Sequence, residues 1–338
     1  MGRLLVGYYI GSQCDMGMVQ VGRKGLGVMK VLTVCSFKRH LPDQMAPFVK
    51  EQVEALRSVS VGCDYFLVQG EGFLGYLRQL KPLKDKIRAF QPDVVHAHFG
   101  LCGLLANLQR KVPVVTTYHG SDINNKTILP FSRMAIRLSA WNVFVSRKTM
   151  EIAKPKKKYS ILPCGIELSD LQLMGKAEAL QRMGLSDGKR YILFAGAFDN
   201  TVKNVLLAKE TVALLCDENV ELLELKGYSR EEVIMLMCAA DALLMTSLSE
   251  GSPQVLKEAM ACGCPIISVD VGDARERMKG IEGCYVAQTR EPQELAELLR
   301  NAFEFGRRTN GREKLLADGL DNQLVARRLV KIYENVLK

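Results

Sequence analysis

The sequence predicts an α/β protein made of two doubly wound domains. Short apolar stretches with the length of buried strands alternate with amphipathic stretches of helical period along most of the 338 residues. The chain is about twice as long as an ordinary single domain, and Pro163 and Gly165 interrupt the pattern near its middle. Regular alternation of this kind favours right-handed crossovers, which place helices on both faces of a mostly parallel sheet.

The first domain is expected at residues 29–165. Its clearest strand is 30–35, a run of apolar and β-branched residues, and helices are expected at 47–59 and 101–110. Further strands of this domain are predicted at 64–68, 93–98, 112–118, 141–145 and 159–162.

The second domain is expected at 166–321, and a C-terminal helix at 322–338 is expected to pack back on the first domain. In that last segment apolar residues such as Val325 and Leu329 recur at helical spacing. Residues 1–28 are Gly-rich and lack strand alternation, so we expect a non-native or disordered leader there. Strands of the second domain are predicted near 190–195, 221–225, 241–245, 264–269 and 283–286.

Composition excludes several classes of protein. With 48% apolar and 25% charged residues the chain is not intrinsically disordered, and no apolar run approaches the ~20 residues of a membrane-spanning helix. The ten cysteines are dispersed without a Cys-x-x-Cys pair, which is typical of reduced thiols in a cytoplasmic protein. Cys262 and Cys264 lack a matching His or Cys pair, so they are a weak basis for a zinc site.

Charge divides the two domains. Residues 29–165 carry 21 Lys and Arg against 9 Asp and Glu, a net charge of +12, whereas residues 166–338 carry 22 against 27, a net charge of −5. A basic surface on one domain indicates an anionic partner, or else a solvated surface that has none. Nucleic acid is not favoured as that partner, because aromatic residues are only 7% and no stacking motif is present.

Two basic clusters, at 81–88 and 154–158, predict reversible docking on an anionic membrane surface. Apolar residues interleave the first cluster, and Pro82 argues against one continuous amphipathic helix, so insertion is expected to be shallow. These apolar residues are Leu80, Leu83, Ile87 and Phe90.

The stretch 250–267 holds the most informative chemistry. Ser252 and Pro253 suit the N-cap and first position of a helix, whose free N–H groups would favour a bound phosphate. Glu250 lies in the loop before this helix and Glu258 about two turns into it. Carboxylates accept hydrogen bonds only, which suits the hydroxyls of a sugar and a ribose held beside a diphosphate.

The spacing Glu250-x7-Glu258, followed by Ala-x-Ala-x-Gly-x-Pro, resembles the signature of family-4 (group 1) retaining glycosyltransferases. Other resembling segments follow in the expected order along the chain. They are the strands 30–35 and 93–98, the turn His119-Gly-Ser-Asp122, the linker 161–167 with Cys164 in place of Asn, and the phosphate-binding segment from Phe194 to Asn204. The resemblance implies the GT-B fold, in which two Rossmann-like domains face each other across a cleft.

The resemblance also implies site residues and a reaction. Glu250, His119 and Lys203 would be catalytic, in a metal-independent hexosyltransferase-type reaction that retains the anomeric configuration. The co-substrate would be a nucleotide-diphosphate sugar, with no cofactor and no metal. The remaining donor-binding residues would be Glu258, Gly251, Ser252, Pro253, Gly196, Asn204 and Asp122.

The implied acceptor is a glycan or a lipid-diphosphate-linked glycan in cell-surface polysaccharide synthesis. The enzyme would then work in the cytoplasm, at the inner face of the cell membrane. Two alternatives stay open: a nucleotide-sugar epimerase of the same fold, and a non-catalytic nucleotide-sugar-binding protein. The pair His96 and His98 has the spacing of metal ligands, but without a third ligand we prefer packing for His96 and a place at the cleft edge for His98.

The sequence departs from the family pattern in three places. Ala197 stands where the family has an arginine, and Lys203 is one residue further from Gly196 than usual, so one diphosphate-binding cation is missing. Lys226 or the helix that follows Ser252 are candidates to replace it. The paired-glycine loop after the first strand is absent, and Glu276 is expected to keep a structural role at a helix start.

Overall fold

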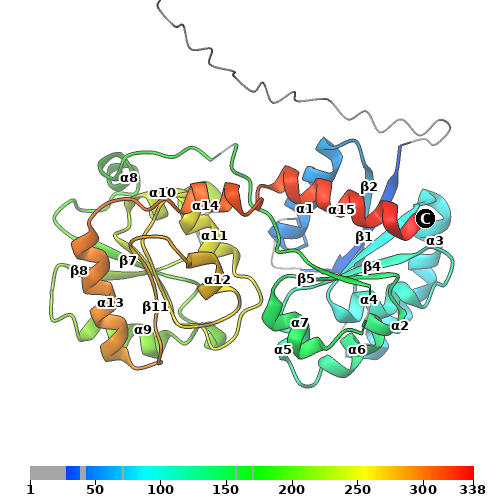
Figure 1. Cartoon of the computed structure of the whole chain (residues 1–338), viewed down its shortest axis with the longest axis horizontal. Coiled ribbons are helices and arrows are strands. Elements are labelled where there is room, and N and C mark those ends of the chain that lie inside the picture. The colour runs from blue at the N-terminus through cyan, green and yellow to red at the C-terminus, as the bar shows by residue number, and fades with distance from the viewer. Residues whose placement is uncertain (1–27, 39–42, 71, 157, 170) are drawn as a thin grey trace, which may run out of the picture.

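The computed structural model describes residues 28–38, 43–70, 72–156, 158–169 and 171–338. In these residues the strands form two separate sheets, and every strand pair is parallel (Figure 1). The N-terminal sheet has the order β2-β1-β3-β4-β5-β6 and the C-terminal sheet the order β11-β10-β9-β7-β8. The predicted α/β class with two doubly wound domains is confirmed.

Every predicted strand is present, with its ends shifted by at most two residues. The strands are β1 (Lys30–Ser36), β2 (Gly62–Val68), β3 (Val94–His98), β4 (Val114–Tyr118), β5 (Trp141–Phe144), β6 (Tyr159–Ile161), β7 (Arg190–Phe194), β8 (Val220–Glu224), β9 (Ala242–Met245), β10 (Ile266–Ser268) and β11 (Cys284–Val286).

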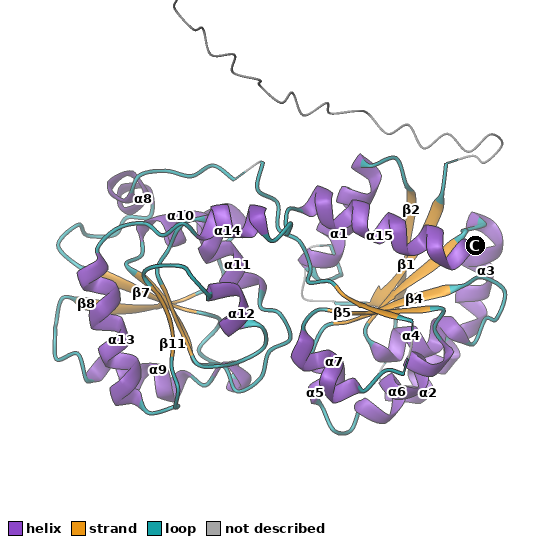
Figure 2. Cartoon of the chain, in the orientation of Figure 1, coloured by secondary structure: helices purple, strands orange, loops and turns teal. Residues whose placement is uncertain are grey.

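Helices cover both faces of each sheet, as Figure 2 shows. The N-terminal domain has α1 (Pro47–Ser58), α2 (Gly72–Arg78), α3 (Leu80–Phe90), α4 (Gly100–Asn107), α5 (Ser121–Asn124), α6 (Leu129–Leu138) and α7 (Arg147–Ala153). The C-terminal half has α8 (Lys176–Arg182), the short 3-10 helix η1 (Thr201–Lys203), α9 (Val205–Ala213), α10 (Arg230–Ala239), α11 (Gln254–Ala261), α12 (Ala274–Met278), α13 (Pro292–Phe305), α14 (Gly311–Ala317) and α15 (Asn322–Leu337).

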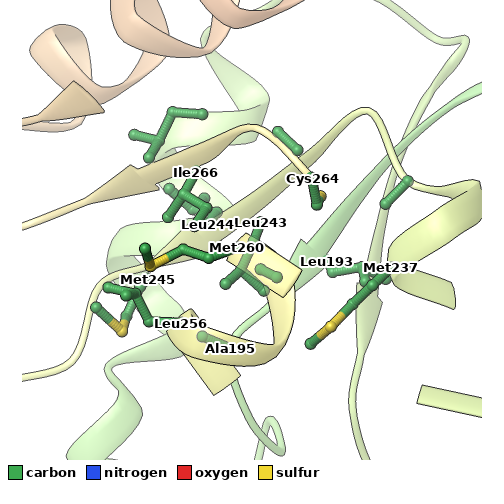
Figure 3. Packing of buried hydrophobic residues seen from close by; sticks show 14 of the residues in the cluster. Leu193, Ala195, Met237, Leu243, Leu244, Met245, Leu256, Met260, Cys264 and Ile266 are labelled. Carbon is green, nitrogen blue, oxygen red and sulfur yellow. The ribbon is translucent and has the colours of Figure 1, made fainter. Parts of the chain in front are cut away.

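The largest core cluster lies in the C-terminal domain. Strands of a parallel sheet are buried on both faces, and their sequences are correspondingly apolar throughout. Figure 3 shows Leu193 of β7, Leu243 and Leu244 of β9, and Ile266 of β10 packed with residues of α10 and α11. This core holds the carboxyl ends of β7 and β9 in place, and the loops that follow these strands contain the predicted donor-site residues.

The segment 80–90 is one continuous helix, α3, which corrects the expectation drawn from Pro82. Pro82 lies in the first turn, where a missing N–H and a fixed φ cost little. The side chains of Leu83 and Ile87 are buried in the core beneath the helix. Two of the four apolar residues expected to insert, Leu83 and Ile87, are therefore taken up by the core, while Leu80 and Phe90 stay partly exposed.

The helix α15 packs on the N-terminal domain, beside α1 (Figure 1). Its residues Val325, Leu329 and Tyr333 share a core cluster with β1 and β3. The chain therefore crosses between the domains twice, and the two crossings pair with each other. The N–H of Ile166 donates to the carbonyl of Leu320, at 2.9 Å, in a short parallel bridge.

No helix in the described part of the chain is long and apolar enough to cross a membrane. The nine described cysteines are free thiols, and most are buried. The predicted leader lies almost entirely outside the described residues.

Candidate active site in the interdomain cleft

The carboxyl ends of the two sheets face each other across a cavity of about 420 Å³. Open α/β sheets bind ligands at this edge, because the loops that follow parallel strands converge there. Both domains line the cavity: the N-terminal domain with Phe48, His119, Val145 and Cys164, and the C-terminal domain with Ala195, Gly196, Lys203, Leu225, Val233, residues 250–255 and Glu258.

Lys203 and Glu250 form an ion pair inside this cavity. The Lys203 Nζ donates to Glu250 Oε1 at 2.6 Å, and both side chains are more than four-fifths buried. Lys203 ends η1, whose position is fixed because the Thr246 hydroxyl donates to the Lys203 carbonyl. A Cβ at Gly196 would lie only 2.8 Å from Lys203 Cγ, so the lysine stem needs the glycine beside it.

The two domains touch backbone to backbone at Gly120 and Gly251. A Cβ on Gly251 would overlap the carbonyl oxygen of His119, and a Cβ on Gly120 would lie 2.6 Å from the Gly251 Cα. The contact places the Glu250 loop directly against the end of β4. A glycine at each position is therefore what allows the cavity to close from both sides.

Glu258 faces the same cavity from the second turn of α11. It has no hydrogen bond or ion pair to any described residue, so its carboxylate oxygens are available to a ligand. Burial raises the pKa of this carboxyl, while the charges of Arg230 and Lys257 oppose the rise.

The helix α11 begins at Gln254, and its N-cap is Pro253, not Ser252 as expected. The Ser252 hydroxyl instead donates to Asp273 Oδ2 at 2.9 Å, in the loop before α12. The first residues of α11 still line the cavity, and the N–H groups of a first helical turn have no partner within the helix. The Ser252 hydroxyl thus fixes the loop, and the helix terminus supplies the anion-binding groups.

Asp122 and Asn204 do not line the cavity. The Asp122 carboxylate is buried and accepts the N–H groups of Gly100, His119 and Gly120, so it holds the turn that carries His119. Burial raises its pKa to about 6 against the lowering effect of these hydrogen bonds. Asn204 has the left-handed φ of 56° that ends η1, and its carbonyl accepts from Thr246. The predicted donor contacts of both residues become positioning roles.

His119 lies in the cavity wall with both ring nitrogens occupied. Its Nε2 shares a hydrogen bond of 3.0 Å with His98 Nδ1, and its Nδ1 lies 3.7 Å from the Cys164 sulfur. The rings of Phe48 and Phe99 pack against it at centroid distances of 4.7 and 4.6 Å. Burial lowers its pKa to about 3, so the imidazole is neutral at pH 7.

Behind His119, His98 and His96 form a buried stack. His96 packs in the core as expected, where it bonds to Thr117 at 2.8 Å and to the Tyr333 hydroxyl at 2.7 Å. His98 was expected at the cleft edge, but it is fully buried and does not line the cavity. The Nε2 of His98 has no partner among the described residues. A buried unpaired N–H costs more than an unpaired lone pair, so His98 carries its proton on Nδ1 and donates to His119.

Three residues that no sequence pattern singled out join the domains at the cavity. The Asn124 side chain donates to the Glu250 carbonyl at 3.1 Å and to Ser249 Oγ at 2.8 Å. Lys257, which has the sequence pattern of an exposed helix charge, is wholly buried and donates to the Cys164 carbonyl at 2.6 Å. Gln254 donates to the Gly165 carbonyl at 3.0 Å. The only sequence signal was their closeness to the Asp122 turn and to Glu258.

Among the described residues that line the cavity, Lys203 is the single Lys or Arg. Lys226 is exposed and pairs with Asp199 at 2.5 Å, outside the lining. Glu276 lies in the first turn of α12 and pairs with Arg277 at 2.5 Å. Within the described ranges no group of three or more His, Cys, Asp or Glu residues could hold a metal ion.

Two family models match consecutive parts of the chain. A model of Glycosyltransferase Family 4 matches residues 37–170, and a model of Glycosyl transferases group 1 matches residues 218–304. Together these matches cover most of both domains.

Curated relatives agree with these matches. TuaC of Bacillus subtilis, assigned as a teichuronic acid biosynthesis glycosyltransferase, is 30% identical over 222 residues, which cover 57% of this chain and 56% of TuaC. AmsK of Erwinia amylovora, an amylovoran biosynthesis glycosyltransferase, is 28% identical over 250 residues, 63% of this chain and 61% of AmsK. The chain thus spans rather more than half the length of these relatives.

Solved structures share the architecture at low sequence identity. Sucrose-phosphate synthase from Thermosynechococcus elongatus has a TM-score of 0.77 at 15% identity, covering 91% of this chain and 99% of that one. HepE of Anabaena, in complex with UDP and glucose, has a TM-score of 0.69 at 15% identity, covering 91% and 100%. The family models and the shared fold together place this chain in the family-4, group 1 glycosyltransferases of GT-B fold.

Proposed function

We propose that the protein transfers a sugar, with retained anomeric configuration, from a nucleotide-diphosphate donor to a glycan or lipid-diphosphate-linked acceptor. The observation that carries the proposal is the cavity in which one cation, two carboxylates and a helix N-terminus converge. Lys203 and the start of α11 suit a diphosphate, and Glu250 and Glu258 suit hydroxyls. The relatives named for teichuronic acid and amylovoran synthesis favour a role in cell-surface polysaccharide, and HepE with UDP favours a nucleotide sugar.

In the proposed reaction the anomeric C–O bond breaks and its electron pair leaves with the diphosphate. The acceptor hydroxyl attacks from the same face, and its proton passes to a phosphate oxygen, so no protein nucleophile is required. Lys203 would move its hydrogen bond from Glu250 to the departing phosphate, where charge grows in the transition state. A neutral His119 does not repel the positive charge that develops on the sugar.

The donor is testable by thermal shift with UDP-, GDP-, ADP- and CMP-sugars. A true donor at 100 times its Kd should add roughly 2.7 kcal/mol to the free energy of unfolding. Glu258→Ala should lose most of this gain, whereas Lys189→Ala, which removes an exposed lysine paired with Glu221, should keep it. Equal shifts in both variants would contradict the assignment of the cavity.

Product analysis separates the alternatives. Transfer requires an acceptor, whereas an epimerase releases altered free sugar without one, and a non-catalytic binder gives a thermal shift without any product. The non-catalytic alternative stays open because the part of the cavity lining that the structure describes holds one cation, Lys203.

Metal independence and location belong to the same proposal. Lys203 and α11 would take the place of a divalent ion at the diphosphate, so transfer should survive EDTA. Loss of transfer with EDTA, and its rescue by Mn²⁺ or Mg²⁺, would overturn this part. The proposed site of action is the cytoplasmic face of the membrane that carries a lipid-linked acceptor.

A further inference from the structure

A second cavity, of about 840 Å³, lies at the opposite edge of the N-terminal sheet. It is lined by the residues before β4, by the end of α6 and by the segment after α7. We call it the basic groove, because seven of its lining residues are cationic. They are Arg110, Lys111, Arg133, Arg137, Lys154, Lys156 and Lys158.

No described residue of the groove supplies a counter-charge to these cations. Among the described residues that line it there is no Asp or Glu, and none of the seven forms an ion pair with a described carboxylate. Among the seven side chains, the one that donates a hydrogen bond to a described residue is Arg133, which bonds to the carbonyl of Ile152 at 3.2 Å. Like charges held together in this way repel one another, so an anionic partner would relieve a real cost.

Large apolar side chains are exposed around the same groove. They come from α6 and α7, whose C-terminal residues line the groove, and from the edge strand β6, which directly follows the lining residue Lys158. A soluble polyanion gains nothing from apolar side chains, whereas a bilayer interface takes both charges and apolar groups. The exposed residues are Met134, Leu138, Ile152, Tyr159 and Ile161, each between 39% and 48% exposed.

The other basic cluster, on α3, has these two features only in part. Leu83 and Ile87 are buried, Lys86 pairs with Asp64 at 2.5 Å, and Arg88 pairs with Asp85. The excess charge of the N-terminal domain is therefore free at the basic groove and partly neutralised on α3.

We propose that the basic groove, with its rim of exposed apolar side chains, docks the protein on an anionic lipid bilayer. The purpose of this docking rests on the proposed function, because it would bring a membrane-borne acceptor to the cleft. The path is short: α7 begins beside Val145 in the donor cavity and ends at the groove, and its seven residues span ~10 Å.

Vesicle sedimentation with the full chain tests the charges. The protein should bind vesicles of phosphatidylglycerol and phosphatidylcholine, fail to bind phosphatidylcholine alone, and be released by salt. The double variant Arg137→Glu/Lys156→Glu should weaken binding by at least about tenfold. The matched control Lys81→Glu/Lys84→Glu, which reverses two exposed charges on α3, should bind like the wild type. Equal weakening in both variants, or in the control alone, overturns the proposal.

Apolar variants decide between a bilayer and a soluble polyanion. Met134→Ser/Leu138→Ser should weaken vesicle binding, while Leu206→Ser, at an exposed site on α9, should not. If the apolar variant binds normally and inorganic tripolyphosphate or RNA displaces the vesicles, the groove is a soluble-anion site and the bilayer proposal fails. Donor thermal shifts on the same variants check folding and should be unchanged. If the wild type showed no thermal shift with any donor, the proposed function would be contradicted, and the vesicle-binding result would still support docking.

Discussion

Lys203 and Glu250 form an ion pair in the wall of the donor cavity, with Lys203 Nζ 2.6 Å from Glu250 Oε1. Lys203→Ala should remove on the order of 2–4 kcal/mol of transition-state stabilisation, by analogy with the loss of one oxyanion donor. Glu250→Ala should likewise reduce turnover far more than it reduces the free energy of unfolding, because Glu250 lies in a loop. Initial rates and urea unfolding of the two variants measure these effects. Wild-type rates in a folded Glu250→Ala protein would contradict the site.

The buried histidines predict acid sensitivity. Burial holds the pKa of His96 and of His119 near 3, and that of His98 well below its usual value, whereas the unfolded chain titrates near 6.5. Between these values the unfolded state binds more protons, so the free energy of unfolding should fall as pH drops below about 6.5. The raised pKa of Asp122 acts in the opposite direction and offsets part of this fall.

Urea unfolding between pH 7 and pH 5 measures this slope. Each neutral histidine contributes up to roughly 1.4 kcal/mol per pH unit in that window. His96→Gln keeps an amide that can bond to Thr117 and should make the slope shallower. An unchanged slope would mean that His96 is not held neutral.

At the residue level, sequence patterns predicted residues that line the cavity better than the buried residues that hold the cavity together. Glu250 and Glu258 were predicted to lie near each other, and both line the cavity, one from the loop before α11 and one from the helix itself. The burial of Lys257 could not be predicted, because a lysine beside a glutamate on a helix has the pattern of a solvated charge. Its burial depends on the linker carbonyl of Cys164, which lies 93 residues away.

At the level of elements, α15 ties the end of the chain to the histidine stack. The Tyr333 hydroxyl bonds to His96 Nδ1 at 2.7 Å, and both side chains are fully buried. Tyr333→Phe should lower the free energy of unfolding by about 1–3 kcal/mol, because it leaves a buried ring nitrogen without its partner. Calorimetry of this variant measures the contribution of the hydrogen bond, and Tyr228→Phe, at an exposed position, is the control. Equal melting temperatures would show that the bond adds nothing.

The strands were predictable because parallel strands buried on both faces are apolar throughout, and their ends come at turn residues. The start of α11 was misplaced by one residue because Ser252 suits an N-cap locally. Its hydroxyl donates instead to Asp273, a partner 21 residues away that no local pattern identifies. The break that Pro82 was expected to cause in α3 is absent. A proline disrupts a helix only beyond the first turn, and Pro82 lies within the first turn.

In the whole molecule, three kinds of contact hold the domains together around the cavity. The chain crosses twice at Ile166 and Leu320, Lys148 pairs with Asp270 at 2.6 Å, and Asn124 holds the Glu250 loop. Local sequence patterns predicted the two-domain fold, but they predicted none of these long-range contacts. The geometry of the donor site is therefore a property of the closed arrangement of both domains.

Gly251 tests this dependence most directly. An added methyl group would overlap the carbonyl oxygen of His119. Neither a Cβ nor a backbone carbonyl can rotate away like the end of a flexible side chain, so the domains must separate slightly to admit it. A misplacement of ~1 Å at a reacting centre costs about 10²-fold in rate, so Gly251→Ala should lose transfer by roughly that factor while remaining folded. Gly175→Ala is the matched control, because a methyl group there meets nothing within 4 Å. Wild-type turnover in Gly251→Ala would mean that the productive state is more open than this structure, because sugar transfer would then not need the backbone contact between His119 and Gly251.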